Sequence, residues 1–169
     1  MAVIHLNPCF VPAPAGAKLK LGIVWSCSGF PPGMGKRRCC ALSAIMAQIN
    51  LAKICVFSLQ VGDAARAELS GYPQVIDLAP DLKDFADTAA AIEDLDLVLS
   101  VDTSVLHLAG AMAKPVWVLL PFLCDWRWML QRDDSPWYPT ARLFRQDKPG
   151  SWDGVLEQVG LNLKQIWSL

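Results

Sequence analysis

Hydrophobic positions along the chain fall into two alternating patterns. Short, nearly continuous apolar runs predict buried strands, and these runs lie at 19–26, 53–59, 74–79, 96–101, 115–120 and 141–146. Apolar residues at helical spacing predict helices at 38–50, 63–70, 84–95, 104–113 and 151–167. Strands that are apolar throughout are typical of a parallel sheet covered on both faces. The pattern therefore predicts an α/β fold: a Rossmann-like, doubly wound parallel six-stranded sheet with helices on both faces and the strand order 3-2-1-4-5-6.

The same pattern predicts how the chain is organised. Residues 1–18 alternate proline with small residues and are expected to form an extended lead-in. Residues 19–169 then make up one domain. Within this domain, Asp84 is expected to cap the helix that follows it, with Asp87 as a carboxylate variant of the capping box.

A polar tripeptide, Asp102-Thr103-Ser104, separates the fourth predicted strand from the next helix. In a doubly wound sheet, ligands bind beyond the carboxyl ends of the strands where the strand order reverses, here between the first and fourth strands. The N–H groups and dipole of a helix start favour an anion, and the hydroxyls of Thr103 and Ser104 add donors. The same side chains could instead simply cap the helix, a contribution of about 1 kcal/mol. The spacing leaves both interpretations open.

Composition narrows the classes of function. A formal net charge of −1 leaves no basic excess that would attract nucleic acid or an anionic membrane. The longest apolar runs, around PVWVLLPFLC, are shorter than the roughly 20 residues that a membrane span needs. The N-terminal residues contain no charged segment followed by an apolar one, so the sequence does not predict a signal peptide. A Gly-x-Gly-x-x-Gly fingerprint does not follow the first strand, which argues against a dinucleotide site.

The six cysteines and two histidines do not have the spacing of a metal site or a disulfide framework. The chain has no Cys-x-x-Cys, and the vicinal pair Cys39-Cys40 is a poor bridge. We therefore expect reduced thiols that act as small apolar side chains, no metal site, and a cytoplasmic location.

The stretch DTSVLHLAGAMAKPVWVLLP, preceded by DFADTAAAIEDLDLVLSV and followed by DWRW, SPWYP and RLFRQ, resembles part of a known family. It is similar to the C-terminal domain of bacterial heptosyltransferase-like glycosyltransferases, closest to the branch often fused to tetratricopeptide repeats. The similarity runs from about Leu21 to Trp152. That family has the GT-B architecture, two Rossmann-like domains facing each other across a cleft. The resemblance implies one half of a GT-B fold, the half that binds a nucleotide-diphosphate-sugar donor.

The resemblance also implies a donor site that uses no metal and no cofactor besides the nucleotide sugar. Asp102, Thr103 and Ser104 match the motif that holds the donor's diphosphate and sugar. His107 matches the histidine of that motif, where an orienting or phosphate-side role is expected. Ser26 falls in the loop after the first strand, which approaches the phosphates.

Four further residues complete the predicted site. Gln60 matches the end of the second strand, which faces the cleft. Asp87 and Thr88 lie where such folds hold the base and ribose, although the start of a helix explains them equally well. Arg38 would bind phosphate through its guanidinium group, or it belongs to a solvated charge run with its two basic neighbours.

The loop after the fifth strand crowds aromatic residues into DWRW and SPWYP. These rings could stack on a base or sugar, cover the edge of the sheet, or face a missing domain. We favour a packing role for Trp126 and Trp128.

Departures from the family pattern set a second hypothesis beside the first. Cys27 stands where the family usually has glycine, and the segment GFPPGMGKRRCC keeps only Arg38 of the family's usual polar residues. Residues 1–18 resemble an interdomain linker, so the N-terminal domain with most acceptor contacts and the usual base is expected to be missing. The chain is then a donor-binding domain inactive alone, whose partner is an N-terminal glycosyltransferase domain or a tetratricopeptide-repeat protein. The alternative is a degenerate, non-catalytic nucleotide-binding or assembly module.

Overall fold

The computed structural model describes residues 19–27 and 34–167. The predicted lead-in at 1–18 lies outside this part of the chain. The strands are β1 Leu19–Val24, β2 Ile54–Ser58, β3 Ile76–Asp77, β4 Leu97–Val101, β5 Val116–Leu120 and β6 Ala141–Arg145. The helices are α1 Met34–Arg38, α2 Leu42–Met46, α3 Asp63–Arg66, α4 Phe85–Glu93, α5 Ser104–Ala111 and α6 Asp153–Trp167. Two 3-10 turns, η1 Ala67–Gly71 and η2 Trp126–Trp128, complete the elements.

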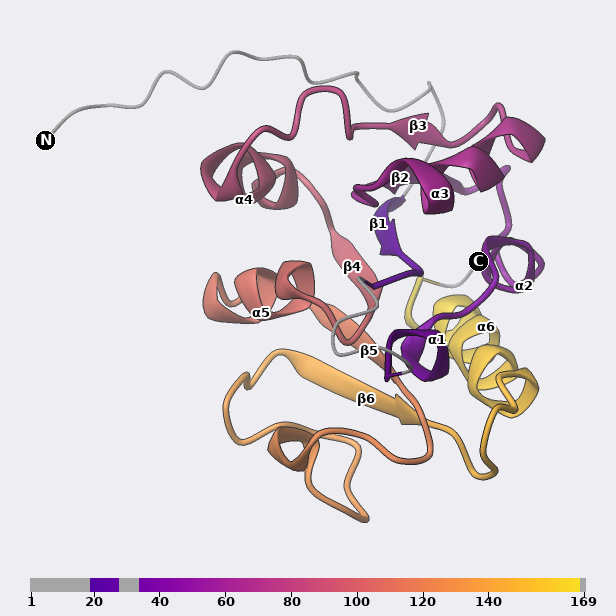
Figure 1. Cartoon of the computed structure of the whole chain (residues 1–169), viewed down its shortest axis with the longest axis vertical. Coiled ribbons are helices and arrows are strands. Elements are labelled where there is room, and N and C mark those ends of the chain that lie inside the picture. Colours follow the sequence, from indigo (N-terminus) through magenta and orange to yellow (C-terminus); the bar gives the residue numbers. More distant parts are fainter. Residues whose placement is uncertain (1–18, 28–33, 168–169) are drawn as a thin grey trace, which may run out of the picture.

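The six strands form one parallel sheet in the order β3-β2-β1-β4-β5-β6 (Figure 1). This confirms both the predicted fold class and the predicted order. In the centre of the sheet, Leu21 of β1 pairs with Val56 of β2 on one side and Leu97 of β4 on the other. The strand order reverses between β1 and β4, so the carboxyl ends of these two strands mark the switch point where such sheets bind ligands.

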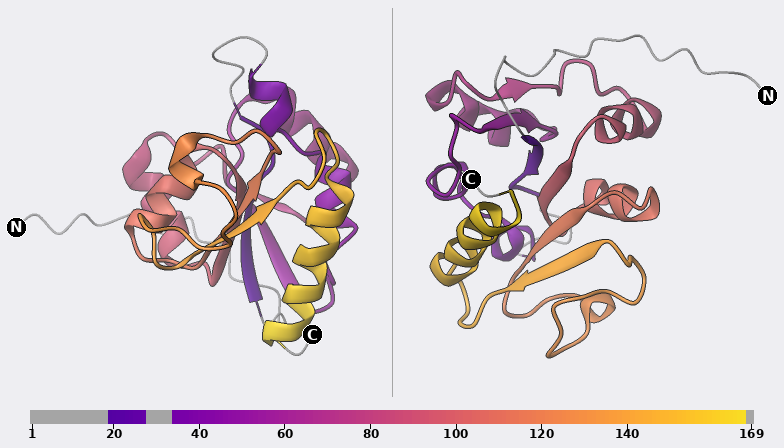
Figure 2. Two further views of the ribbon diagram at one scale, coloured as in Figure 1. Left: turned by 90° about the horizontal axis from the view of Figure 1, so that it is seen from below. Right: turned by 180° about the vertical axis from the view of Figure 1, so that it is seen from behind.

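Helices cover both faces of the sheet (Figure 2). On one face, Leu21 and Ile23 of β1 belong to a core cluster that includes the apolar side chains of α2 and α6. On the other face, Val24 belongs to a cluster with the apolar side chains of α4 and α5. Because side chains alternate along a strand, a strand that is apolar throughout contributes to both clusters. Among the described residues, each helix is too short or too polar to span a bilayer.

The predicted helix at 38–50 is wrong in its bounds. The structure has α1 ending at Arg38 and a separate α2 beginning at Leu42. The break arises because Cys40 N–H donates to the Trp25 carbonyl oxygen at 2.9 Å, which ties this segment to the end of β1. Leu42 N–H in turn donates to the Glu68 carboxylate at 3.1 Å. These partners are distant in sequence, so helical periodicity could not reveal the break.

Candidate ligand-binding site

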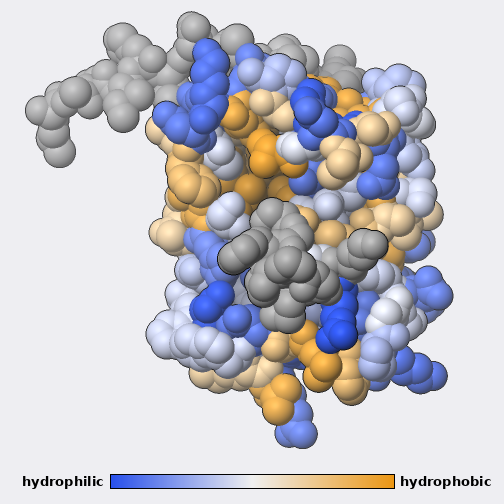
Figure 3. All heavy atoms as spheres, viewed as in Figure 1, coloured by the Kyte–Doolittle hydropathy of each residue, from blue (hydrophilic) through white to orange (hydrophobic). Residues whose placement is uncertain are grey.

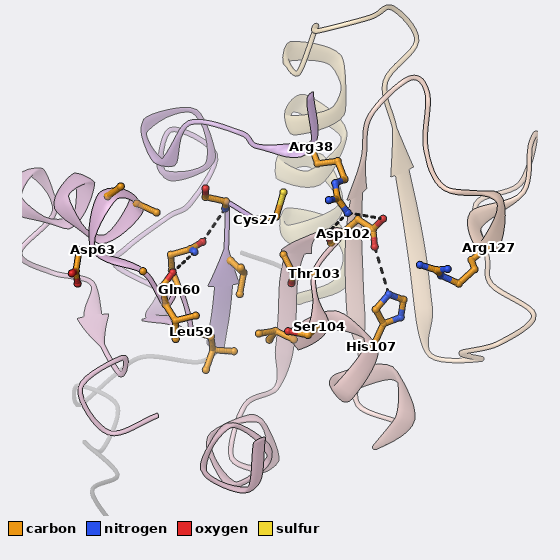
Figure 4. Close-up of a pocket in the computed structure, with 17 residues that line it drawn as sticks. Cys27, Arg38, Leu59, Gln60, Asp63, Asp102, Thr103, Ser104, His107 and Arg127 are labelled. Atoms are coloured by element: carbon orange, nitrogen blue, oxygen red, sulfur yellow. Dashed lines mark hydrogen bonds and ion pairs between the residues drawn. The ribbon is translucent and has the colours of Figure 1, made fainter. Parts of the chain in front are cut away.

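A cavity of about 740 Å³ opens at the carboxyl ends of β1, β2 and β4 (Figure 4). This is the switch point at which the sequence predicts a ligand. Seven of the nine predicted site residues line the cavity: Ser26, Arg38, Gln60, Asp102, Thr103, Ser104 and His107. The volume lies in the range of pockets that hold small molecules and cofactors.

The start of α5 forms one wall of the cavity without a side-chain cap. Thr103 is the N-cap residue and has extended backbone angles, yet its side chain makes no capping hydrogen bond. Its hydroxyl lies 3.1 Å from the Ser100 hydroxyl instead. The interpretation of Thr103 as a simple cap therefore fails. Within residues 19–27 and 34–167, no side chain caps the start of α5, whose first N–H groups carry the positive end of the helix dipole.

Asp102 is the buried centre of a small polar network. Its side chain is 5% exposed, and its carboxylate lies 3.5 Å from His107 Nε2 and 3.7 Å from Arg38 Nη1. Arg38 Nη1 also donates to the Asp102 carbonyl oxygen at 3.4 Å. Arg38 Nε is buried and has no hydrogen-bond partner among the described residues. The network thus fixes Arg38 at the cavity while part of its hydrogen-bonding capacity is unused.

The pKa of Asp102 reflects opposing influences. Burial raises the pKa, but the hydrogen bond from His107 and the charges of His107 and Arg38 hold it below its ordinary value. The neighbouring Trp128 indole N–H also lowers the pKa, although this N–H makes no hydrogen bond of normal length and angle. Asp102 is therefore a carboxylate that orients its neighbours rather than a group prepared to accept a proton.

His107 is held from both sides of its ring. Its Nδ1 lies 3.0 Å from the Tyr138 hydroxyl, and Nε2 faces Asp102. The ring stacks on Trp128 with centroids 5.5 Å apart and planes inclined by 16°. In the tautomer that donates Nε2–H to Asp102, Nδ1 accepts the Tyr138 O–H. Both ring nitrogens of His107 are therefore engaged within the domain.

Gln60 holds the end of β1 in place. Its Oε1 accepts hydrogen bonds from Trp25 N–H at 3.2 Å and Ser26 N–H at 2.9 Å, and its Nε2 donates to the Val61 carbonyl oxygen. Because these bonds occupy the amide, Gln60 shapes the cavity wall through the backbone that it fixes. The Ser26 hydroxyl lies 3.4 Å from Cys39 Sγ.

The structure does not bring Asp87 and Thr88 into the cavity. The Asp84 carboxylate accepts from the N–H groups of Ala86 and Asp87, which confirms the predicted cap of α4. The Asp87 carboxylate accepts from Lys83 N–H, and the Thr88 hydroxyl donates to the Asp84 carbonyl oxygen. Both side chains therefore serve the first turn of α4. Their expected contacts with a base and ribose stay a prediction.

Sequence analysis missed contributions from the aromatic loop, from Cys27 and from residues 61–65, which also line the cavity. Arg127 lines the cavity, and Tyr138 and Trp128 hold His107 from the aromatic loop. The SPWYP and DWRW motifs were the available signal, but nothing in their spacing pointed to His107. Cys27 also lines the cavity, with its Sγ 3.8 Å from that of Cys39. Burial, and then the neighbouring Cys39, raise the pKa of the Cys27 thiol to about 11.

No cluster of three or more potential metal ligands occurs among the residues that the structure describes. The donors that converge on the cavity are instead N–H groups, hydroxyls and a guanidinium group. Such a set suits an anionic ligand with several oxygen atoms.

Comparison with known proteins supports the fold. The chain matches no family model. Protein FlbA of Caulobacter vibrioides is 33% identical over 118 residues, which are 64% of this chain and 19% of FlbA. The E. coli heptosyltransferase WaaC with ADP has a TM-score of 0.58 and 14% identity over 90% of this chain and 44% of WaaC. The complex of WaaC with ADP-2-deoxy-2-fluoro heptose has a TM-score of 0.59 and 12% identity over 89% of this chain and 45% of WaaC.

The chain thus spans about a fifth of the curated relative and less than half of the WaaC structures that it matches. Sequence identities this low establish similarity of fold, and the site has to be argued from its own residues. The chain therefore has an α/β fold similar to that of less than half of the heptosyltransferase WaaC.

Proposed function

We propose that this domain binds a nucleotide-diphosphate sugar as the donor half of a GT-B glycosyltransferase. The main support for this proposal is the start of α5. It lacks a side-chain cap and faces the cavity at the switch point beside Arg38. A diphosphate would accept hydrogen bonds from the first N–H groups of α5 and the hydroxyl of Ser104. The guanidinium group of Arg38 would supply positive charge.

The chemistry would be transfer of a sugar to an acceptor hydroxyl. As the bond between the sugar and the diphosphate breaks, negative charge grows on the leaving diphosphate. The helix dipole and Arg38 would stabilise that charge without a divalent metal ion. Asp102 and His107 would keep Arg38 and the start of α5 in position, since both contact the cavity from fixed orientations.

The comparisons support adenosine diphosphate as the first ligand to test, because the WaaC structures contain ADP and an ADP-heptose analogue. The chain spans 44% of WaaC, so an acceptor wall and a general base would come from a second domain. We propose that the domain alone is inactive. Its partner would be an N-terminal glycosyltransferase domain or a tetratricopeptide-repeat protein, in the cytoplasm.

A thermal-shift titration with ADP, UDP, GDP and free phosphate tests the proposal. A ligand at 100 times its dissociation constant adds about 2.7 kcal/mol of stability. For a domain of this size, that corresponds to a rise in Tm of roughly 5–10 °C. A rise with one nucleoside diphosphate, larger than with phosphate, would support donor binding. If none of the four ligands raises the Tm, donor binding is overturned and the assembly module is favoured. One sequence feature also favours the assembly module: Cys27 stands at a position where the resembled family has glycine.

Two neighbouring arginines provide a matched pair of variants. Arg38 lines the cavity, whereas Arg37 is exposed and does not. Charge-assisted hydrogen bonds contribute about 1.5–3 kcal/mol. Arg38→Gln should therefore weaken nucleoside-diphosphate binding at least about tenfold, and Arg37→Gln by less than about twofold, as measured by isothermal titration calorimetry. Equal losses in both variants would show a general effect of charge and remove Arg38 from the site.

A further inference from the structure

A second, smaller cavity of about 210 Å³ adjoins the first one. Six residues line it: His107, Trp126, Arg127, Trp128, Trp137 and Tyr138. Two of them, His107 and Arg127, also line the larger cavity, so the two spaces share a wall. In the view of Figure 4, Asp63 and Gln60 lie at one end of the larger cavity, and His107 and Arg127 lie at the other. A ligand with its diphosphate at the start of α5 could therefore extend past His107 toward the smaller cavity.

Hydrogen bonds fix the loop that carries two of the three indole rings of this cavity, those of Trp126 and Trp137. Trp126 and Trp137 meet edge to face, with centroids 6.5 Å apart and planes inclined by 89°. Trp137 Nε1 donates to the Arg127 carbonyl oxygen at 3.1 Å, and Arg127 N–H donates to the Asp125 carboxylate at 3.0 Å. These bonds keep the rings in one geometry. They nevertheless leave Trp126 71% exposed and Trp137 54% exposed.

The composition of the smaller cavity identifies the class of ligand. Flat indole surfaces favour the apolar C–H face of a sugar ring, while the Arg127 guanidinium group and the Tyr138 hydroxyl can bind sugar hydroxyls. A cationic ligand is disfavoured, because the guanidinium group of Arg127 already lies 5.7 Å from the Trp126 ring centroid. The volume suits one ring rather than a whole nucleotide, for which the larger cavity has space.

We propose that Trp126 and Trp137 form a subsite that stacks on a sugar ring next to the diphosphate. This inference rests on the proposed function for its ligand class. The ring could come from the donor, where it is joined to the diphosphate, or from the acceptor. Both sources share the same chemistry, and the experiment below separates them.

Leu123 supplies a matched control for Trp126. Hydrophobic side chains reach the surface at the end of the molecule formed by the β5–β6 connection (Figure 3). Leu123 of the same loop is 71% exposed, as is Trp126, but it does not line the smaller cavity. Leu123→Ala thus removes the same kind of exposed apolar surface from the same loop without touching the subsite.

The experiment compares wild type with Trp126→Ala, Trp126→Ala/Trp137→Ala and Leu123→Ala. Calorimetry measures the affinity for ADP, UDP and GDP, and for ADP-glucose, UDP-glucose and GDP-mannose. Calorimetry also measures the binding of methyl glucoside and maltotriose, because a fluorescence signal from Trp126 and Trp137 would be lost in the variants whether or not the glycoside binds. For a donor ring, the tryptophan variants should bind the nucleotide sugar at least about fivefold more weakly, while affinity for the nucleoside diphosphate changes less than about twofold. This follows because the indole rings would supply the surface on which the sugar ring stacks, and the diphosphate would not contact them. For an acceptor ring, the loss should fall on the free glycosides.

Other results separate this inference from the proposed function. If nucleoside diphosphates bind but the affinity for every sugar ligand is independent of Trp126 and Trp137, the subsite is overturned and the proposed function stands. If free glycosides bind to wild type but not to the tryptophan variants, and no diphosphate binds, the subsite is upheld and the proposed function is overturned. Self-association that Trp126→Ala abolishes, in the absence of any sugar effect, would assign the rings to a protein contact and overturn the subsite.

Discussion

At the scale of single residues, buried polar side chains act here as positioning groups. Gln60 accepts two N–H groups at the end of β1, and Gln146 does the same for Phe122 and Gly150 beyond the end of β6. Each glutamine therefore fixes a loop at the carboxyl edge of the sheet. At these two loops the backbone donors are satisfied from within the domain, whereas the first N–H groups of α5 at the same edge lack a side-chain cap.

Gln60→Leu should show what this positioning contributes. The variant keeps a side chain of similar size but leaves the N–H groups of Trp25 and Ser26 without their acceptor. Leaving buried donors unpaired costs about 1–3 kcal/mol, so urea denaturation should give an unfolding free energy lower by that amount. An unchanged free energy would mean that water replaces the lost acceptor. Gln48→Leu, at a half-buried position on the α2 side of the sheet, serves as the control.

At the scale of elements, the contact between α5 and the aromatic loop depends on a glycine. A Cβ added at Gly110 would lie 2.5 Å from the Tyr138 ring, closer than packing allows. The absence of a side chain at this position lets Tyr138 lie against α5 and reach His107. The SPWYP loop and the helix that carries His107 are thus fitted to each other.

Gly110→Ala should therefore destabilise the domain and displace Tyr138. Overpacking of a fixed contact costs typically about 1–3 kcal/mol. Gly154→Ala is the matched control, because it also lies in a helix but has nothing within 4 Å of the added Cβ. That variant should be neutral or more stable by roughly 0.5–1 kcal/mol. Thermal denaturation of both variants checks the difference, and equal stabilities would show that the aromatic loop moves aside freely.

Elements could be predicted where their signals are local. The strands follow from their apolar runs, and the start of α4 follows from Asp84, whose carboxylate accepts the N–H groups predicted for a cap. The break between α1 and α2 could not be predicted, because its cause lies in hydrogen bonds to Trp25 and Glu68 from other parts of the chain. Local patterns determine which elements form, and long-range contacts determine where some of them end.

At the scale of the whole molecule, the candidate site is assembled from segments far apart in the sequence. Arg38 and Asp102 are 64 residues apart, and His107 and Tyr138 are 31 residues apart. The switch-point rule predicted that the ends of β1 and β4 would meet, and so placed Ser26 near Asp102, whereas the contact of Arg38 with Asp102 became visible only in the structure. No such rule covers the loop after β5. The partners of His107 therefore became visible only in the structure.

The same assembly should make the stability of the whole domain depend on acid pH through Asp102. The folded-state pKa of Asp102 lies below its ordinary value of about 3.9. Above that ordinary value the carboxylate is ionised in both the folded and unfolded chain, and its interactions stabilise the fold in full. As pH falls further, the unfolded chain takes up the proton first, and the stabilisation is lost as pH passes through the folded-state pKa. Asp102→Asn cannot take up this proton. Its unfolding free energy, measured by urea denaturation from pH 7 to pH 3, should therefore fall less steeply than that of wild type.

Asp134 also has a lowered pKa, caused by its hydrogen bond with Arg132, but this pair is exposed and screened by solvent. Asp134→Asn should thus leave the slope unchanged. If instead Asp134→Asn flattened the slope and Asp102→Asn did not, the buried network around Asp102 would not be the group that links this domain's stability to pH.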